Sequence, residues 1–344
     1  MAPSELASFA RGLPKAELHL HLEGTLEPDM MFALAQRNGL TLPYSDVAAV
    51  KAAYDFTDLT SFLAVYYPAM GVLQTADDFH DLAWAYLLRA KEQGVVHAEL
   101  FFDPQAHTGR GIPFATVIGG YRRAVVRAQA ELGISAELIL CFLRDLSAEH
   151  AMSTLLEALP YRHWIVGVGL DSDERDNPPA KFAAVFERAR AEGFLVTMHC
   201  DIDQPGSIDH IRQALELGVD RIDHGTNIVE DPDLVALVVE RGIGLTCCPV
   251  SNSFVTEQMK SDEIISLLRA GVRVTINSDD PAYFGGYVGD NYVALAEQAG
   301  LSASDLVELA RNSFHASWLT PARRAAYLEL VDEYAIAAGV RSAA

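Results

Sequence analysis

Residues 194–224, FLVTMHCDIDQPGSIDHIRQALELGVDRIDH, decide the fold. Phe194–His199 and Arg221–His224 are short apolar runs typical of buried strands, and Ile208–Leu217 between them has the apolar spacing of an amphipathic helix. A strand, a helix and a second strand in this order predict two parallel strands joined by a right-handed crossover. Both predicted strands end in a histidine, so both imidazoles are expected at the same end of the sheet.

The same alternation extends over the whole chain and predicts an α/β fold, a (β/α)8 barrel of TIM type. No low-complexity linker or internal repeat interrupts it, so we expect one domain over residues 1–344. The eight predicted strands are Ala16–Leu22, Val95–Phe102, Ala136–Phe142, Trp164–Leu170, Phe194–His199, Arg221–His224, Ile243–Cys247 and Val272–Asn277. The predicted helices include Pro113–Leu132, Pro179–Glu192, Ile208–Leu217, Asp231–Glu240, Asp262–Ala270, Ala303–Ser313 and Pro321–Ala338.

The first connection, residues 24–94, is unusually long for a barrel of this kind. It contains several helical patterns, among them Asp58–Tyr67, and we expect it to form a lid or a flank.

Composition limits the partners of the protein. The 344 residues carry 47 acidic and 26 basic side chains, a net charge of −21, which disfavours binding to nucleic acid polymers and to anionic membrane surfaces. No apolar run is long enough to span a membrane, and the first residues lack the pattern of a secretion signal. We therefore expect a cytoplasmic protein, with a homo-oligomer left open.

The four cysteines do not form a metal-binding or redox motif. Cys141, Cys200, Cys247 and Cys248 contain no CxxC spacing, and adjacent cysteines rarely bridge each other. Buried, reduced thiols are the expected state.

Histidines and a carboxylate collect at the predicted strand ends. His19 and His21 are two apart on the first strand, so both imidazoles point to the same side. His199 and His224 end the fifth and sixth strands, and Asp279 follows the eighth. Reacting groups in barrels lie at the C-terminal ends of the strands. These residues therefore indicate one active site.

The residue types suggest metal-dependent hydrolysis. Three imidazoles and a carboxylate suit one Zn²⁺ with room for a water molecule, which the ion activates. We assign His19, His21, His199 and Asp279 to the metal and His224 to the catalytic base or orienting group.

Five motifs resemble the adenosine/adenine deaminase family of the amidohydrolase superfamily. They are HLHLEG at 19–24, LFFDPQAHTGRG at 100–111, GLDSDE at 169–174, RIDHG at 221–225 and NSDDPAYFGGY at 277–287. The resemblance runs almost end to end, and FFDPQ, GLDSDE and DDPAYFGGY are closer to adenine deaminases than to the nucleoside enzymes. It implies a zinc-dependent deaminase that attacks C6 of adenine or a related purine.

The resemblance also implies residue roles. In the family, the residues that match the four named above bind the metal. The residue that matches His224 assists the attack of hydroxide on the substrate. Asp280 would hydrogen-bond the purine ring. Glu23 is similar to the acidic residue that faces the sugar side of the substrate, and a glutamate there would shorten the pocket in favour of a free base.

One position departs from the family pattern. The family has HAGE after the fifth strand, where the glutamate donates a proton to the ring nitrogen, but here Ile202 occupies that place in His199-Cys200-Asp201-Ile202. Loss of a general acid typically costs about 10²–10⁴-fold in rate.

Three explanations stay open. In the first, Asp201 or Asp203 replaces the acid. In the second, the substrate is a purine, such as an N6-substituted one, that needs no such acid. In the third, the chain is a weakly active barrel that binds metal and ligand. Hydrolysis of another heteroaromatic substrate is a further alternative. The sequence leaves the exact substrate and the native metal undetermined.

Overall fold

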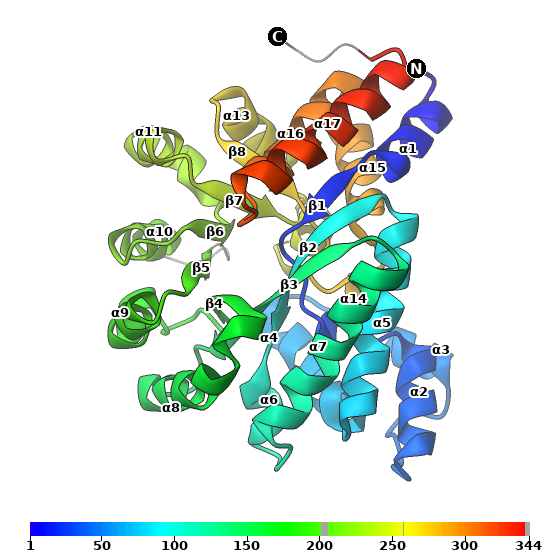
Figure 1. Ribbon diagram of the computed structural model, residues 1–344, viewed down its shortest axis with the longest axis vertical. Coiled ribbons are helices and arrows are strands. Elements are labelled where there is room, and N and C mark those ends of the chain that lie inside the picture. Colours follow the sequence, from blue (N-terminus) through cyan, green and yellow to red (C-terminus); the bar gives the residue numbers. More distant parts are fainter. Residues whose placement is uncertain (201–205, 257, 341–344) are drawn as a thin grey trace.

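The computed structural model describes residues 1–200, 206–256 and 258–340. Within these ranges, eight parallel strands lie side by side in chain order and curve into a nearly closed barrel (Figure 1). The predicted barrel is confirmed. The strands are β1 Lys15–Glu17, β2 Val95–Phe102, β3 Ser135–Leu143, β4 Ile165–Asp171, β5 Leu195–Cys200, β6 Arg221–His224, β7 Gly244–Cys247 and β8 Arg273–Ile276.

Helices surround the strands (Figure 1). In the described ranges the α-helices are α1 Pro3–Gly12, α2 Pro28–Arg37, α3 Val47–Ala52, α4 Leu59–Ala69, α5 Ala76–Glu92, α6 Pro104–Thr108, α7 Phe114–Glu131, α8 Ala148–Ala158, α9 Ala183–Ala191, α10 Ser207–Glu216, α11 Pro232–Arg241, α12 Pro249–Val255, α13 Ser261–Arg269, α14 Pro281–Phe284, α15 Val288–Ala299, α16 Ala303–His315 and α17 Pro321–Ala337. Short 3-10 turns are η1 Glu23–Thr25, η2 Met70–Val72, η3 Leu159–Trp164, η4 Pro179–Phe182 and η5 Thr226–Glu230. No helix among the described residues is long and apolar enough to cross a membrane.

Local sequence explains where a typical helix begins and ends. Asp231 caps α11 by accepting hydrogen bonds from the backbone N–H groups of Asp233 and Leu234, and Pro232 occupies the first turn, where no hydrogen bond is lost. Gly242 ends the helix with φ +63°, a conformation that glycine adopts without strain. The predicted helix Asp231–Glu240 is therefore correct to one residue at each end.

The first predicted strand is longer than the observed one. β1 ends at Glu17 because the backbone N–H of Leu18 donates to the side-chain Oδ1 of Asn277, at 2.8 Å, and not to a neighbouring strand. The chain then forms bridges at Leu20 and His21 with residues beyond β8 and in β2. The predicted placement of the HxH pair within a continuous strand was wrong, although the chain passes through the same part of the barrel.

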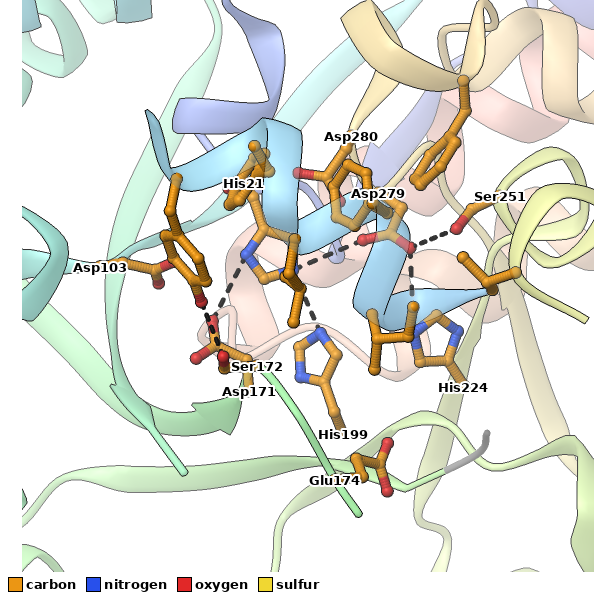
Figure 2. Close-up of a pocket in the computed structure, with 17 residues that line it drawn as sticks. His21, Asp103, Asp171, Ser172, Glu174, His199, His224, Ser251, Asp279 and Asp280 are labelled. Atoms are coloured by element: carbon orange, nitrogen blue, oxygen red, sulfur yellow. Dashed lines mark hydrogen bonds and ion pairs between the residues drawn. The ribbon is translucent and has the colours of Figure 1, made fainter. Parts of the chain in front are cut away.

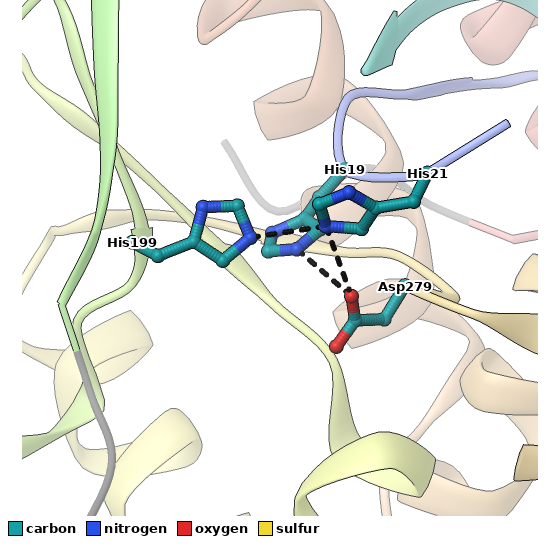
Figure 3. A group of neighbouring side chains, drawn as sticks. All are labelled: His19, His21, His199 and Asp279. Atoms are coloured by element: carbon teal, nitrogen blue, oxygen red, sulfur yellow. Dashed lines mark hydrogen bonds and ion pairs between the residues drawn. The ribbon is translucent and has the colours of Figure 1, made fainter. Parts of the chain in front are cut away.

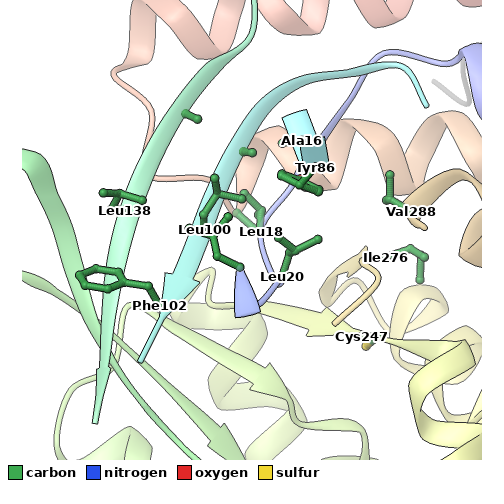
Figure 4. Close-up of a cluster of buried hydrophobic side chains, with 14 of the residues drawn as sticks. Ala16, Leu18, Leu20, Tyr86, Leu100, Phe102, Leu138, Cys247, Ile276 and Val288 are labelled. Carbon is green, nitrogen blue, oxygen red and sulfur yellow. The ribbon is translucent and has the colours of Figure 1, made fainter. Parts of the chain in front are cut away.

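Side chains still alternate across this segment. Leu18 and Leu20 belong to the apolar cluster between the strands and the helices, together with Leu100 and Ile276 (Figure 4). The intervening histidine therefore points into the barrel. All four cysteines are free and buried, as predicted.

A buried ion pair crosses the barrel interior below the strand ends. The guanidinium of Arg221, in β6, donates to the carboxylate of Glu99, in β2, and both side chains are about 1% exposed or less. Arg221 also stacks on Trp318, with 4.3 Å between the guanidinium carbon and the ring centroid. Burial opposes ionisation of Glu99, but Arg221 lowers the pKa of that carboxyl to about 2. The pair ties opposite sides of the barrel together.

We expect Glu99→Ala to lower the free energy of unfolding by about 3–5 kcal/mol, because it leaves the buried charge of Arg221 without its partner. Glu192→Ala is the control, since it breaks an exposed pair with Arg188 and should change stability by about 0.5 kcal/mol or less. Urea unfolding followed by circular dichroism measures both. The contribution of the pair to the free energy of unfolding should be complete above about pH 4.3, the pKa of glutamate in the unfolded chain. It should be lost as the pH falls toward 2, the pKa of Glu99 in the folded protein. Equal losses in the two variants would contradict this.

Candidate metal centre and adjoining pocket

Four side chains predicted as metal ligands converge inside the barrel (Figure 3). His21 Nε2 lies 3.1 Å from His199 Nε2 and 3.4 Å from Asp279 Oδ1, and His19 Nε2 lies 3.2 Å from the same oxygen. One potential ligand atom of each residue lies within 4.8 Å of all the others, and all four side chains are buried.

Neighbouring groups fix which ring nitrogen faces the centre. His199 Nδ1 donates to the backbone carbonyl of Leu170 at 3.1 Å. His19 Nδ1 lies 2.9 Å from Thr246 Oγ1, whose own proton goes to Asp223 Oδ1, so the imidazole is the donor. A nitrogen that donates carries the proton, which leaves a lone pair on Nε2. Both Nε2 atoms are therefore prepared to bind a cation.

His21 follows the same pattern, with Nδ1 3.5 Å from Asp171 Oδ2. Burial lowers the pKa of His21 to about 4 and that of His199 well below its usual range, so both rings are neutral near pH 7. Burial also disfavours the charged form of His19, yet the carboxylate of Asp279 raises the pKa of that ring. The centre therefore attracts positive charge.

Asp279 is held by its backbone in a left-handed conformation, φ +64°. This conformation is unfavourable for a residue other than glycine. Its N–H donates to the carbonyl of His19 and its carbonyl accepts from the N–H of His21, at 3.1 and 3.0 Å. Burial opposes ionisation, but His19 holds the pKa of Asp279 well below its usual range. Ser251 Oγ donates to Oδ2 at 2.7 Å, which leaves Oδ1 toward the histidines.

This donor set fits a divalent metal ion. Three imidazole nitrogens and one ionised carboxylate oxygen are ligands that zinc and similar ions prefer. His19 Nε2 is buried and has no hydrogen-bond partner among the described residues. Cys248 also lies near Asp279, but burial raises the pKa of its thiol, which donates to the carbonyl of Thr246. The thiol is therefore protonated and a poor ligand.

His224 ends β6 beside these four residues and also has a positive φ, +59°. Its Nε2 lies 3.9 Å from Asp279 Oδ2, and its Nδ1 is buried without a hydrogen-bond partner in the described ranges. Burial lowers the pKa of His224, so the ring is neutral and able to accept a proton.

A pocket of about 580 Å³, open space at its mouth included, adjoins the metal centre (Figure 2). Helix α4 from the long first connection forms part of its wall, so the expected lid or flank contributes to the site. None of the described residues that line it is a lysine or an arginine. The lining residues are His21, Leu59, Phe62, Leu63, Tyr66, Tyr67, Asp103, Asp171, Ser172, Glu174, His199, His224, Ser251, Val255, Asp279, Asp280 and Phe284.

Asp280 lines the pocket and is 4% exposed. It precedes Pro281 and α14, but its side chain does not cap that helix, and Oδ1 has no hydrogen-bond partner among the described residues. Burial raises the pKa of Asp280 well above its usual range, and Asp279 adds to this. Gly24 packs against it so closely that a Cβ would lie 2.7 Å from the Asp280 Cα, which explains why glycine occupies that position.

Glu23 lies behind the pocket wall and is not among the residues that line it. It is fully buried, and its Oε1 accepts hydrogen bonds from His107 Nε2 and the Tyr121 hydroxyl, both at 2.9 Å. His107 also contacts Arg110, at 2.9 Å. His107, in the LFFDPQAHTGRG motif, thus belongs to a network around Glu23.

Several pocket residues were not predicted. Asp103 and Asp171 lie in two of the motifs that resemble the family, but no role was predicted for them. Ser251 lies in CCPVSN, residues 247–252, where no spacing rule identifies it. Their proximity to the metal centre depends on strand register. Asp201, Ile202 and Asp203 lie outside the described residues.

Comparison with known proteins identifies the family. The sequence profile described as adenosine deaminase matches residues 14–334. The chain belongs to the adenosine deaminase family. A curated adenine deaminase of Zymomonas mobilis subsp. mobilis is 52% identical over 334 residues, which cover 96% of this chain and 98% of that protein.

Two solved structures of similar proteins agree with this adenosine deaminase fold. The adenine deaminase of Arthrobacter aurescens is 44% identical, with a TM-score of 0.91 over 94% of this chain and 99% of the other. A Burkholderia ambifaria amidohydrolase with bound zinc is 28% identical, with a TM-score of 0.89 over 98% and 94%. With the metal-binding cluster described above, this family membership makes the chain a metal-dependent hydrolytic deaminase.

We expect His199→Ala to lose most of its bound metal, because it removes one of the inward-facing lone pairs. His163→Ala is a matched control, since His163 lies in η3, outside the cluster and the pocket lining. Elemental analysis of both variants after dialysis against a weak chelator measures the difference. Full metal content in His199→Ala would exclude this residue as a ligand.

Proposed function

We propose that this chain is an adenine deaminase that holds one Zn²⁺ through His19, His21, His199 and Asp279. The observation that carries the proposal is the convergence of three Nε2 atoms and one carboxylate on the wall of a pocket sized for a small molecule. Relatives named adenine deaminase, about 50% identical over nearly the whole chain, support the choice of substrate.

Electrostatics favour an uncharged free base over a nucleotide. The lining carboxylates are Asp103, Asp171, Glu174 and Asp280, and the described lining residues offer no lysine or arginine to a phosphate. A phosphate group carries nearly two negative charges at pH 7 and would find no cationic side chain on this wall to compensate them. Adenine is neutral and presents hydrogen-bond donors and acceptors on every edge.

Each catalytic residue has a separate task in this proposal. His19, His21, His199 and Asp279 would hold the ion, which when bound would supply activated water for C6. His224 has a neutral ring with an unshared nitrogen, so it accepts a proton from the attacking water and orients it. Asp280 is protonated because burial raises its pKa, and its O–H donates a hydrogen bond to a ring nitrogen of the purine.

Glu23 acts in this proposal by shaping the pocket on the side where the sugar of a nucleoside would extend. Its Oε1 accepts from the backbone N–H of Asp103, at 3.4 Å, as well as from His107 and Tyr121. The network fixes the wall in front of Glu23 and so favours a free base.

The zinc-loaded wild-type protein should release ammonia from adenine and convert it to hypoxanthine, with adenosine and AMP much poorer substrates. An enzyme-coupled ammonia assay together with chromatography of the products measures this. Metal-replete protein that releases no ammonia from adenine, or one that prefers AMP, would overturn the proposed substrate.

In the same assay His224→Ala should retain its metal but lose about 10²–10⁴-fold in kcat, because it removes the proton acceptor and no ligand. Elemental analysis provides the control. A metal-depleted His224→Ala protein would show that His224 is itself a ligand.

A further inference from the structure

One wall of the pocket carries buried carboxyl groups. Asp103 and Asp171 hydrogen-bond each other, and Tyr66 hydrogen-bonds Asp280. Asp103 Oδ1 is buried without a donor in the described ranges, and Asp103 is 1% exposed. Burying an unsatisfied polar group costs about 1–3 kcal/mol. Such a wall is stable in the presence of a ligand that donates hydrogen bonds to it.

Asp103 lies on the far side of His21 from the centre of the metal cluster. Figure 2 shows Asp103 and Asp171 on one side of His21, and Asp279 and Ser251 on the other. His21 is therefore shared: its Nε2 faces Asp279 and its Nδ1 faces Asp171. A ring whose reacting carbon lies at the metal centre extends its opposite edge toward the Asp103 side.

The position of Asp103 is fixed through its backbone, and its carboxyl group hydrogen-bonds that of Asp171, while Oδ1 has no donor among the described residues. Its N–H donates to Glu23 Oε1, and its side chain makes no capping hydrogen bond to α6, the helix that it precedes. The hydroxyl of Tyr67, a possible donor on the same wall, already donates to Ser172 Oγ at 2.8 Å. The other buried hydroxyl there, that of Tyr66, hydrogen-bonds Asp280.

We propose that Asp103 accepts a hydrogen bond from the N–H of the five-membered ring of a free purine and thereby selects the free base over N9-substituted purines. This inference rests on the proposed function, because it places C6 of the purine at the metal centre. A nucleoside has no N–H at N9, so it would leave the Asp103 carboxylate unsatisfied and would place its sugar against it. A buried acceptor that is left unpaired discriminates more strongly than a missing apolar contact.

The test compares adenine with the amino-oxazolopyrimidine in which an oxygen atom replaces N9–H, an analogue of nearly the same size. In the wild type, kcat/KM should be about 10- to 100-fold higher for adenine, the range expected when a buried acceptor is left unpaired. Asp103→Ala should lower kcat/KM for adenine by a similar factor and change that for the analogue by less than about threefold. Asp103→Asn, which keeps one acceptor oxygen, should be intermediate.

Asp173→Ala is the matched control, because it removes a nearby carboxylate that does not line the pocket and that accepts from the backbone N–H of Arg175. It should leave the ratio of the two kcat/KM values unchanged. Equal losses for both substrates in Asp103→Ala, or a wild type that does not distinguish them, would overturn the role of Asp103.

A binding measurement tests the role of Asp103 independently of the proposed deaminase activity. Purine and the unsubstituted oxazolopyrimidine carry no amine to release, and calorimetry with the metal-loaded wild type compares their affinities directly. Tighter binding of purine supports Asp103 recognition even if no ammonia is formed from adenine, which would overturn the proposed function alone. Equal affinities would overturn the inference, whether or not Asp103→Ala folds.

Discussion

The closure of the barrel at Asp279 is the interaction on which the site depends. The same residue joins the chain after β8 to the chain after β1 through two backbone hydrogen bonds and places its carboxylate against the imidazoles of His19 and His21. A sheet that closes at this point cannot vary the distance between these ligands without breaking its own hydrogen bonds. Asp279 adopts an unfavourable positive φ because its backbone closes the barrel while its carboxylate faces the histidines.

The protein also determines the chemical state of each ligand. A backbone carbonyl at His199 and a hydroxyl at His19 each occupy the outer ring nitrogen, and a carboxylate lies 3.5 Å from the outer nitrogen of His21. The inner nitrogens therefore have lone pairs before any ion arrives, and little reorganisation accompanies binding. His224 lacks such a partner in the described ranges, which suits a group that must gain and lose a proton.

Sequence alone predicted the barrel and the convergence of His19, His21, His199 and Asp279, because both follow from local patterns. Strand periodicity places His19 and His21 on one side, and strand ends in a parallel barrel share one rim. It could not predict that the Asn277 side chain interrupts β1, since that depends on a contact across the closing seam. Asp103 was missed because nothing in its local sequence shows that folding places its carboxyl group against Asp171 in the pocket wall.

The two kinds of buried acid in this barrel are stabilised in different ways. Glu99 lies near the base of the barrel and accepts from Arg221 and from the backbone N–H of Trp318, so its charge is compensated within the protein. Asp103 and Asp171 are equally buried, but burial raises the pKa of both, to about 7 for Asp171, and the two carboxyl groups hydrogen-bond each other. A buried acid without a cation avoids the cost of a buried charge by keeping its proton. The acid that pairs with a cation therefore lies away from the pocket, whereas the acids that line the pocket are held in or near their neutral form.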